Sequence, residues 1–129
     1  MSVDMLIGRK DGMTHVYDDE GRHVPVTIVT VGPCPVVQVK TPETDGYHAV
    51  QLGFGDRRAK TATKPMLGHD KKAGVPVRRV LREARLDEAT EVKAGEVLTV
   101  GDVFREGQAI DVIGTSKGRG YAGTIKRWG

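Results

Sequence analysis

Residues 14–29, THVYDDEGRHVPVTIV, decide the fold class of this chain, because they hold two β-type segments on either side of a turn. From Val24 to Val29, β-branched residues alternate along the chain as they do in strands. The acidic stretch 18–21 separates this segment from Thr14–Tyr17. Its glycine, Gly21, can adopt the positive φ that a tight turn requires. We therefore predict a β-hairpin here.

Further short strands are predicted along the chain. Val36–Lys40 and Tyr47–Phe54 have β-type composition and are joined by turn residues at Glu43–Gly46. Val97–Val103 and Ala109–Ile113 form two more predicted strands. Short strands at this spacing, with Gly and Pro between them, favour a sandwich or a small barrel, so the predicted fold class is mainly β.

The size and composition of the chain limit the classes of protein to which it can belong. Its 129 residues suffice for one domain with one core, so we predict a single domain over 1–129. No apolar run approaches the ~18 residues of a membrane span, and the first residues have no apolar segment typical of a secretory signal. The single cysteine, Cys34, cannot form an internal disulfide, which agrees with a cytosolic location.

The charges are strongly segregated, although the net charge is only +3. Residues 57–85 contain ten basic and two acidic side chains, and residues 114–129 contain four basic side chains and no acid. Like charges at this density repel one another unless a polyanion neutralises them. Two phosphate-binding surfaces are therefore expected; the alternative is that both blocks are solvated charged faces.

The first basic block is predicted to be a loop followed by a short helix, over 57–86. From Gly55 to Gly74 no hydrophobic period is sustained, so this segment is predicted to be extended or looped. Val77, Val80, Leu81 and Ala84 then follow the spacing of one helical face, with arginines around them. Pro76 suits the first turn of such a helix.

The second basic block contains Gly118–Gly123, which matches the dinucleotide-binding pattern GxGxxG. That pattern works only between a strand and a helix, with an acidic residue about 20 positions later for the ribose. No acid follows Gly123, and no strand–helix–strand pattern precedes it. No phosphate-binding loop of the GxxxxGK[ST] type occurs either. We predict no nucleotide cofactor.

No residue pattern in the chain indicates catalysis or metal binding. Cys34 and the four histidines are scattered without the close spacing of metal ligands, although His15 and His23 could meet across the predicted hairpin. A nucleophile would need a base and an orienting group, and none is indicated. We therefore predict no catalytic, metal or cofactor-binding residues and no small-molecule substrate.

The remaining pattern is basic, rich in glycine and interleaved with aromatic residues. Lysine and arginine bind phosphates, and Tyr121 and Trp128 offer faces for stacking on bases, although core packing is the alternative for both. Two irregular basic segments without a DNA-reading helix favour structured RNA, recognised by its shape and backbone.

Motifs along almost the whole chain resemble those of the large-subunit ribosomal protein L3 family of bacterial type. The opening stretch Ile7–Thr14 before an acidic turn carries the resemblance, and so does the segment Gly114–Gly123 followed by Lys126–Trp128. Shorter matches are Val24–Thr27, Gln38–Thr41, Asp45–Tyr47, Val50–Gly53, Lys64–Pro65, Gly68–His69 and Lys72–Val75. The family often has an aromatic residue at the position of Asp70, so Asp70 weakens a stacking contact beside His69. It often has a phenylalanine at the position of Ala84, so Ala84 leaves less apolar volume under the predicted short helix.

The resemblance implies a translation-protein-type β-barrel in the large ribosomal subunit, located in the cytoplasm. It implies direct binding of 23S-type rRNA, a part in early subunit assembly, neighbouring ribosomal proteins as partners, and no enzymatic activity. Residues 114–129 would be the base of a glycine-rich arm directed towards the peptidyl transferase centre. The alternative function is a free-standing RNA chaperone or a translation-factor-like RNA-binding barrel.

The expected rRNA-binding residues come from both basic blocks. The resemblance places some of them in the family's basic loop and arm, and the charge pattern adds the rest. They are Arg57, Arg58, Lys60, Lys64, His69, Lys71, Lys72, Arg78, Arg79, Arg82, Lys117, Arg119, Tyr121, Lys126, Arg127 and Trp128. The family continues beyond the position of Gly129, so the barrel is expected to be incomplete. We therefore expect an exposed strand edge and a tendency to aggregate.

Overall fold

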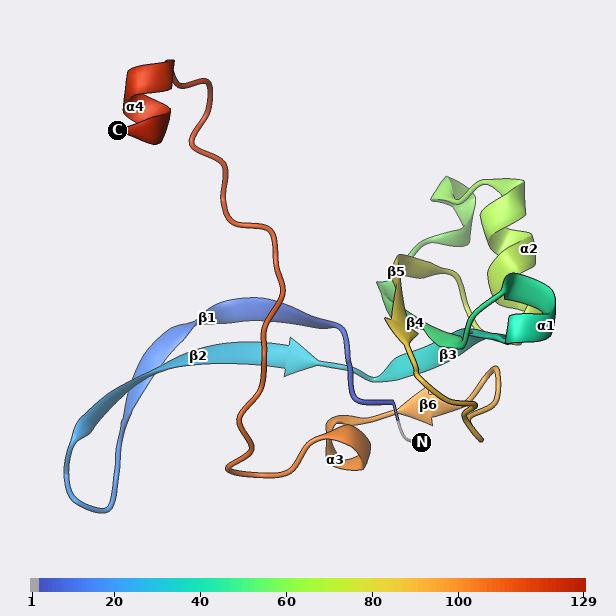
Figure 1. Ribbon diagram of the computed structural model, residues 1–129, viewed down its shortest axis with the longest axis horizontal. Helices are drawn as coiled ribbons and strands as arrows, with labels where there is room; N and C mark the ends of the chain where they lie inside the picture. The colour runs from blue at the N-terminus through green and yellow to red at the C-terminus, as the bar shows by residue number, and fades with distance from the viewer. Residues whose placement is uncertain (1–2) are drawn as a thin grey trace.

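The computed structural model describes residues 3–129 and contains the predicted hairpin as a long, curved ribbon (Figure 1). Strands β1 (Gly8–Tyr17) and β2 (His23–Val31) pair in antiparallel register. In the turn between them, the carboxylate of Asp18 accepts hydrogen bonds from the backbone N–H groups of Glu20 and Arg22. Gly21 has φ +76° there. The prediction is confirmed, with longer strands than expected.

The second sheet has four antiparallel strands in the order β5-β4-β3-β6. These strands are β3 (Cys34–Lys40), β4 (Ala49–Asp56), β5 (Arg78–Arg85) and the two-residue β6 (Val97–Leu98). The first two confirm the strands predicted at 36–40 and 47–54. The turn predicted at Glu43–Gly46 contains the short helix α1 (Pro42–Asp45), which ends at Gly46 with φ +84°.

The core lies on one face of this sheet. Val36, Val50 and Leu52 are completely buried on that face. Val3, Cys34, Ala84, Leu86 and Leu98 complete the same cluster. Alternate residues of neighbouring strands share a face, so the β-type alternation of the sequence directs these side chains into one core.

The loop predicted at 55–74 is wrong in its second half, where helix α2 (Lys64–Lys72) forms after a short 3-10 turn η1 (Ala59–Thr61). Pro65 lies in the first turn, where proline costs no intrahelical hydrogen bond. Two basic side chains, Lys71 and Lys72, lie in the last turn and compensate the negative end of the helix dipole. The sequence pattern did not predict this helix, because the glycine and the lysines in it weaken the hydrophobic period that indicates a helix.

The helix predicted over 77–85 is also wrong, because this segment forms β5. The strand pairs with β4 along its whole length, with Val80 opposite Phe54 and Ala84 opposite Val50. Residues four apart share a face in a strand as well as in a helix, so the i, i+4 spacing fits both structures. The segment forms a strand and not a helix because the edge of β4 offers hydrogen-bond partners to its backbone.

The strands predicted near the C-terminus are mostly wrong. Within 97–103 only β6 is a strand, and it is followed by the short helix α3 (Val100–Val103), which begins with a capping box between Thr99 and Asp102. Residues 109–113 find no partner strand in the described part of the chain, and Ile110, Val112 and Ile113 are exposed. A last short helix, α4 (Thr124–Trp128), follows the irregular segment.

The mainly β fold class is confirmed, but the two sheets do not close into a barrel over residues 3–129. No helix among the described residues is both long and apolar enough to span a membrane. The single-domain assignment to 1–129, whose first two residues lie outside the described range, stays a prediction.

Candidate nucleic-acid interface

The cations of the first basic block lie on the connection from β4 to α2, on α2 itself and on β5. Of the ten lysines and arginines at 57–85, only Arg78 lies within ion-pair distance of a carboxylate in the described chain. Its partner is Asp56, whose Oδ1 lies 2.6 Å from Nη1 of Arg78. The other nine cations have no neutralising carboxylate in residues 3–129, so an external anion can compensate their charge.

Most of the predicted binding residues of this block are accessible from solvent. Three of them, Arg57, His69 and Arg78, are half-buried. The exposed ones are Arg58, Lys60, Lys64, Lys71, Lys72, Arg79 and Arg82. The structure thus offers seven of the ten predicted residues to a partner without rearrangement.

Arg78 lies flat on the neighbouring strand, and its side chain is only 16% exposed. Gly53 on β4 makes this close approach possible, because a Cβ at Gly53 would lie 2.6 Å from Cγ of Arg78. With the Asp56 ion pair, this packing gives Arg78 a role in joining β4 to β5. Its predicted contact with RNA stays a prediction.

Arg57 supports the start of α2 from the preceding turn. Its Nη2 donates a hydrogen bond to the backbone carbonyl of Thr61 at 3.0 Å, and its Nη1 lies 3.8 Å from the sulfur of Met66. The backbone N–H of Arg57 also donates to the carbonyl of Val77 at 3.0 Å. Arg57 therefore holds the β4–α2 connection in place while its neighbour Arg58 stays exposed.

A polar network links α2 to the sheet through His69. The Nε2 atom of His69 lies 2.6 Å from Oε1 of Gln51 on β4, and the amide nitrogen of Gln51 donates to Glu83 on β5 at 3.3 Å. Lys40 lies 2.8 Å from the same carboxylate, and Tyr47 donates its hydroxyl to it at 2.9 Å. The network therefore spans three strands and fixes the orientation of α2 on the sheet.

The network shifts the pKa values of its two charged members. The hydrogen bond from the Lys40 ammonium, together with those from Tyr47 and Gln51, lowers the pKa of the Glu83 carboxyl. The same contact with Glu83, and one with Tyr47, raises the pKa of Lys40. Both side chains are therefore charged across the neutral range, and the ion pair persists there.

Asp70 is buried and serves the connection from α2 to β5. Its Oδ2 accepts a hydrogen bond from the backbone N–H of Arg78 at 3.3 Å, and its carbonyl accepts from Ala73 and Val75. The side chain is 1% exposed, so it cannot stack on a base.

The second basic block lies on an exposed tail. All residues of 114–129 except Ala122 are exposed, and Tyr121 is completely accessible. Trp128 is 78% exposed, with the guanidinium of Arg127 at 5.5 Å from its ring. The predicted cations here are Lys117, Arg119, Lys126 and Arg127, and all are exposed. Core packing, the alternative for both aromatic residues, does not occur in this chain.

The structure keeps the two basic blocks apart. Figure 1 shows α4 well away from α2 and β5, at the end of a segment that leads out from α3. Gly118–Gly123 lies in this irregular segment, and only the five-residue α4 follows it. The two blocks therefore form two separate candidate surfaces.

His15 and His23 lie side by side across the hairpin, as the sequence analysis considered possible. The rings of His15 and His23 lie 4.4 Å apart, and Tyr17 contacts both of them edge-on. No group of three or more potential metal-ligating side chains occurs in the part of the chain that the structure describes.

The site prediction omitted two cations that have the same character as its members. Arg85 is exposed at the end of β5, with its guanidinium 4.9 Å from the ring of Tyr47. Lys93 is exposed in the loop that precedes β6. The charge pattern could have identified Arg85, which ends the first basic block, whereas Lys93 lies in an acidic region of the sequence.

Comparison with known proteins identifies relatives over nearly the whole chain. The profile of the family described as Ribosomal protein L3 matches residues 80–129. The chain is 52% identical over 127 residues to the large ribosomal subunit protein uL3 of Syntrophobacter fumaroxidans, and 58% identical over 127 residues to that of Heliobacterium modesticaldum. It is 56% identical over 124 residues to the protein of the same name from Gloeobacter violaceus.

These matches cover 95–98% of this chain and 57–60% of each relative. The chain thus spans about 60% of the length of the curated relatives that it matches. Over nearly its whole length, the chain is therefore similar to large ribosomal subunit proteins of the ribosomal protein L3 family.

Proposed function

We propose that this chain is a structural, non-enzymatic component of the large ribosomal subunit that binds 23S-type rRNA directly. The observation that carries the proposal is the set of nine cations at 57–85 without a carboxylate partner in the described chain. Phosphates of RNA would neutralise them. The names of the relatives, large ribosomal subunit proteins, identify the RNA to be expected.

The mode of binding follows from the chemistry of the two surfaces. Exposed arginines and lysines on α2 and β5 contact phosphates, with the guanidinium forks binding two oxygens at once. On the tail, Tyr121 and Trp128 stack on bases while the neighbouring cations hold the backbone. Each of these contacts works without a cofactor, so the proposed role requires none.

The proposal extends to the setting of the protein. Residues 114–129 form the base of an arm directed towards the peptidyl transferase centre, and the exposure of this segment supports a partner outside the chain. Neighbouring ribosomal proteins contact the sheets of the chain in the cytoplasmic ribosome. Early binding during subunit assembly fits a protein with two separate RNA surfaces.

Salt dependence tests RNA binding by this chain. If 6–10 phosphates are contacted, the affinity for large-subunit rRNA falls ~10³–10⁵-fold between 50 and 200 mM salt. A response that is flat over this range would contradict a phosphate-based interface. Arg79→Gln and Lys71→Gln, both exposed and unpaired, should each reduce the slope, whereas Arg9→Gln on the hairpin is the matched control outside both blocks.

Sedimentation tests the ribosomal location. In a sucrose gradient of a bacterial lysate, a subunit protein migrates in a one-to-one ratio with the large subunits and remains with them at moderate salt. A free-standing RNA chaperone stays mostly at the top of the gradient. Recovery mainly at the top would support that alternative and overturn the assignment to the subunit.

A further inference from the structure

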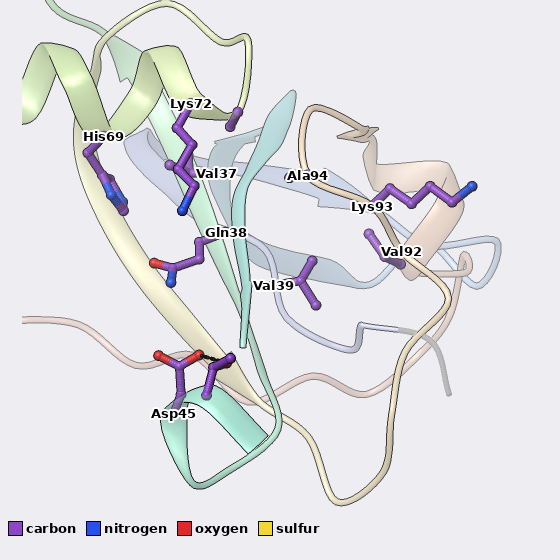
Figure 2. Close-up of a pocket in the computed structure, with 11 residues that line it drawn as sticks. Val37, Gln38, Val39, Asp45, His69, Lys72, Val92, Lys93 and Ala94 are labelled. Atoms are coloured by element: carbon purple, nitrogen blue, oxygen red, sulfur yellow. Dashed lines mark hydrogen bonds between the residues drawn. The ribbon is translucent and has the colours of Figure 1, made fainter. Parts of the chain in front are cut away.

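A hollow of about 570 Å³ lies beside the first basic block and has no role in the proposed interface so far. Figure 2 shows it between the last turn of α2, helix α1, strand β3 and the loop at 92–94. Its volume is within the range of ~300–1,000 Å³ typical of small-ligand sites. It is open to solvent, so one unit of a longer polymer can enter it without being cut off from its neighbours.

The floor of the hollow is the outer edge of β3. On this edge of β3, β6 pairs only with Cys34 and Pro35, so Val37–Lys40, which pairs with β4 on its other edge, has no partner strand on this one among the described residues. The unpaired edge of a strand presents backbone donors and acceptors. Val37, Val39 and Val92 add apolar surface to this floor. Hydrogen-bonding groups therefore lie beside apolar side chains.

The two ends of the hollow carry opposite charges. Lys72 on α2 extends its ammonium group into the space towards Gln38, beside His69 (Figure 2). On the opposite side, Asp45 on α1 lines the hollow, and its Oδ2 accepts a hydrogen bond from Thr44 at 2.8 Å. An occupant therefore needs an anionic group at one end and a hydrogen-bond donor at the other, with a flat apolar body between them.

We propose that the hollow binds a single unstacked RNA nucleotide whose base carries an amino group. The phosphate lies at Lys72, the base lies on the valines, and its amino group donates to the carboxylate of Asp45. Adenine, cytosine and guanine have such a group, whereas uracil lacks it and has only a ring N3–H, which is flanked by two carbonyl oxygens that a carboxylate repels. A carboxylate that accepts from the amino group of cytosine is an established type of base contact. This inference rests on the proposed function, because RNA must first bind to α2.

An extended peptide that pairs with the free edge of β3 is the competing occupant. RNA is favoured because Lys72 lines the hollow and two more exposed cations, Lys64 and Lys71, lie on the same helix, all without carboxylate partners in the described chain. A strand bound along these cations passes over the mouth of the hollow. Unstacked bases of single-stranded RNA are also the parts of RNA that proteins read for sequence.

The test measures base preference on the 129-residue chain. Fluorescein-labelled rC6, rA6 and rU6 are titrated at 100 mM salt and followed by fluorescence anisotropy. We expect rC6 and rA6 to bind about tenfold more tightly than rU6, because only they have an exocyclic amino group that donates a hydrogen bond to the charged acceptor. Amide NMR shifts on addition of rC6 should centre on residues 37–39, 45 and 72.

Asp45→Asn is the decisive variant, and Asp19→Asn is its control. Both remove one negative charge, but Asp19 lies in the turn of the hairpin, away from the hollow. Asp45→Asn should reduce the preference for rC6 over rU6 to about one- to twofold, while Asp19→Asn should leave it at about tenfold. Far-UV circular dichroism and a thermal melt check that both variants fold like the wild type.

The outcomes separate this inference from the proposed function. If none of the three oligonucleotides nor rRNA binds, the proposed function fails and the inference fails with it. If all three bind equally and with a steep salt dependence, RNA binding stands and the hollow is not a nucleotide site. NMR shifts that avoid residues 37–39 would also overturn the inference and favour the peptide as occupant.

Discussion

The guanidinium of Arg78 forms a 2.6 Å contact with the carboxylate of Asp56, directly opposite it in the register of β4 and β5. The next residue, Arg79, is exposed and has no carboxylate partner among residues 3–129. The side chains of successive residues in a strand point to opposite faces, so these two adjacent arginines have different surroundings although their chemistry is the same. Arg78 joins two strands, and Arg79 is free to bind a phosphate.

This difference predicts a separation of stability from RNA affinity. Arg78→Gln should lower the urea midpoint, because it leaves Asp56 without its partner and removes an almost buried side chain, and should change the salt slope of RNA binding little. Arg79→Gln should leave the midpoint unchanged and reduce the slope by about 0.7–0.9, the value for one lost phosphate contact. Urea unfolding and binding at several salt concentrations measure the two effects. Equal slopes for both variants would contradict this division.

A second prediction concerns the pH dependence of the Lys40–Glu83 pair. Because its folded pKa is lowered, Glu83 contributes stability that is present above its ordinary value of 4.5 and is lost as the pH falls through the lowered pKa. Lys40 has a raised pKa, so its contribution is present below 10.5 and is lost only as the pH rises through the raised value. The pair therefore stabilises the sheet across the range from about pH 5 to pH 10.

Glu83→Gln tests this window. The variant should have a lower urea midpoint than the wild type at pH 7. The difference should narrow as the pH falls below 4.5, where Glu83 becomes protonated in the unfolded chain, and should vanish once the pH falls through the lowered pKa of the folded chain. Glu88→Gln, an exposed acid for which no ion pair is found in the described chain, is the control and should show no such trend. A difference that stays constant down to pH 3 would contradict the ion-pair explanation.

The sequence predicted the hairpin and the central strands correctly because their hydrophobic period is unambiguous. At Val80 and Ala84 it failed, since a four-residue spacing fits a strand and a helix, and only the free edge of β4 selects the strand. The strand at 109–113 had the right composition and found no partner. Pairing between distant segments decided both of these errors, and a local pattern does not contain that information.

In the candidate site, too, the features that depend on local sequence were predicted and those that depend on contacts between distant segments were not. The charge pattern located the exposed cations, because segregated charge is a property of the sequence alone. It could not show that Arg78 is paired with Asp56, since these residues are 22 positions apart and meet only through the sheet. It also gave no sign of the hollow beside β3, whose walls come from four separate segments.

A third prediction uses the burial of Asp70. Asp70→Ala should destabilise the chain by about 0.5–1.5 kcal/mol, because the half-buried backbone N–H of Arg78 then loses its side-chain acceptor. Asp70→Asn retains an acceptor oxygen and should destabilise it less. Urea unfolding of both variants measures the difference. If Asp70→Ala were as stable as the wild type, the hydrogen bond would not hold the α2–β5 connection.

A fourth prediction concerns the aromatic residues of the tail. Tyr121 and Trp128 are exposed, so Tyr121→Ala and Trp128→Ala should leave the thermal melt unchanged. Each should weaken RNA binding by about 1–3 kcal/mol if the ring stacks on a base. Ile125→Ala, an exposed apolar residue of the same segment that cannot stack, is the control. A loss of thermal stability in either aromatic variant would show that the ring packs against the protein.

A final prediction concerns self-association through the hairpin. The ribbon of β1 and β2 pairs with no other strand in the described chain, and Met13, Val16 and Ile28 are exposed on it. Unpaired edges with apolar side chains pair readily with other molecules, whereas the outer edge of β5 carries Arg79 and Arg82, and charged side chains of this kind discourage pairing. Sedimentation velocity should therefore show concentration-dependent association at micromolar concentrations. Ile28→Lys should reduce it, whereas Ile113→Lys, in the tail, should not. A monodisperse wild-type monomer would contradict the prediction.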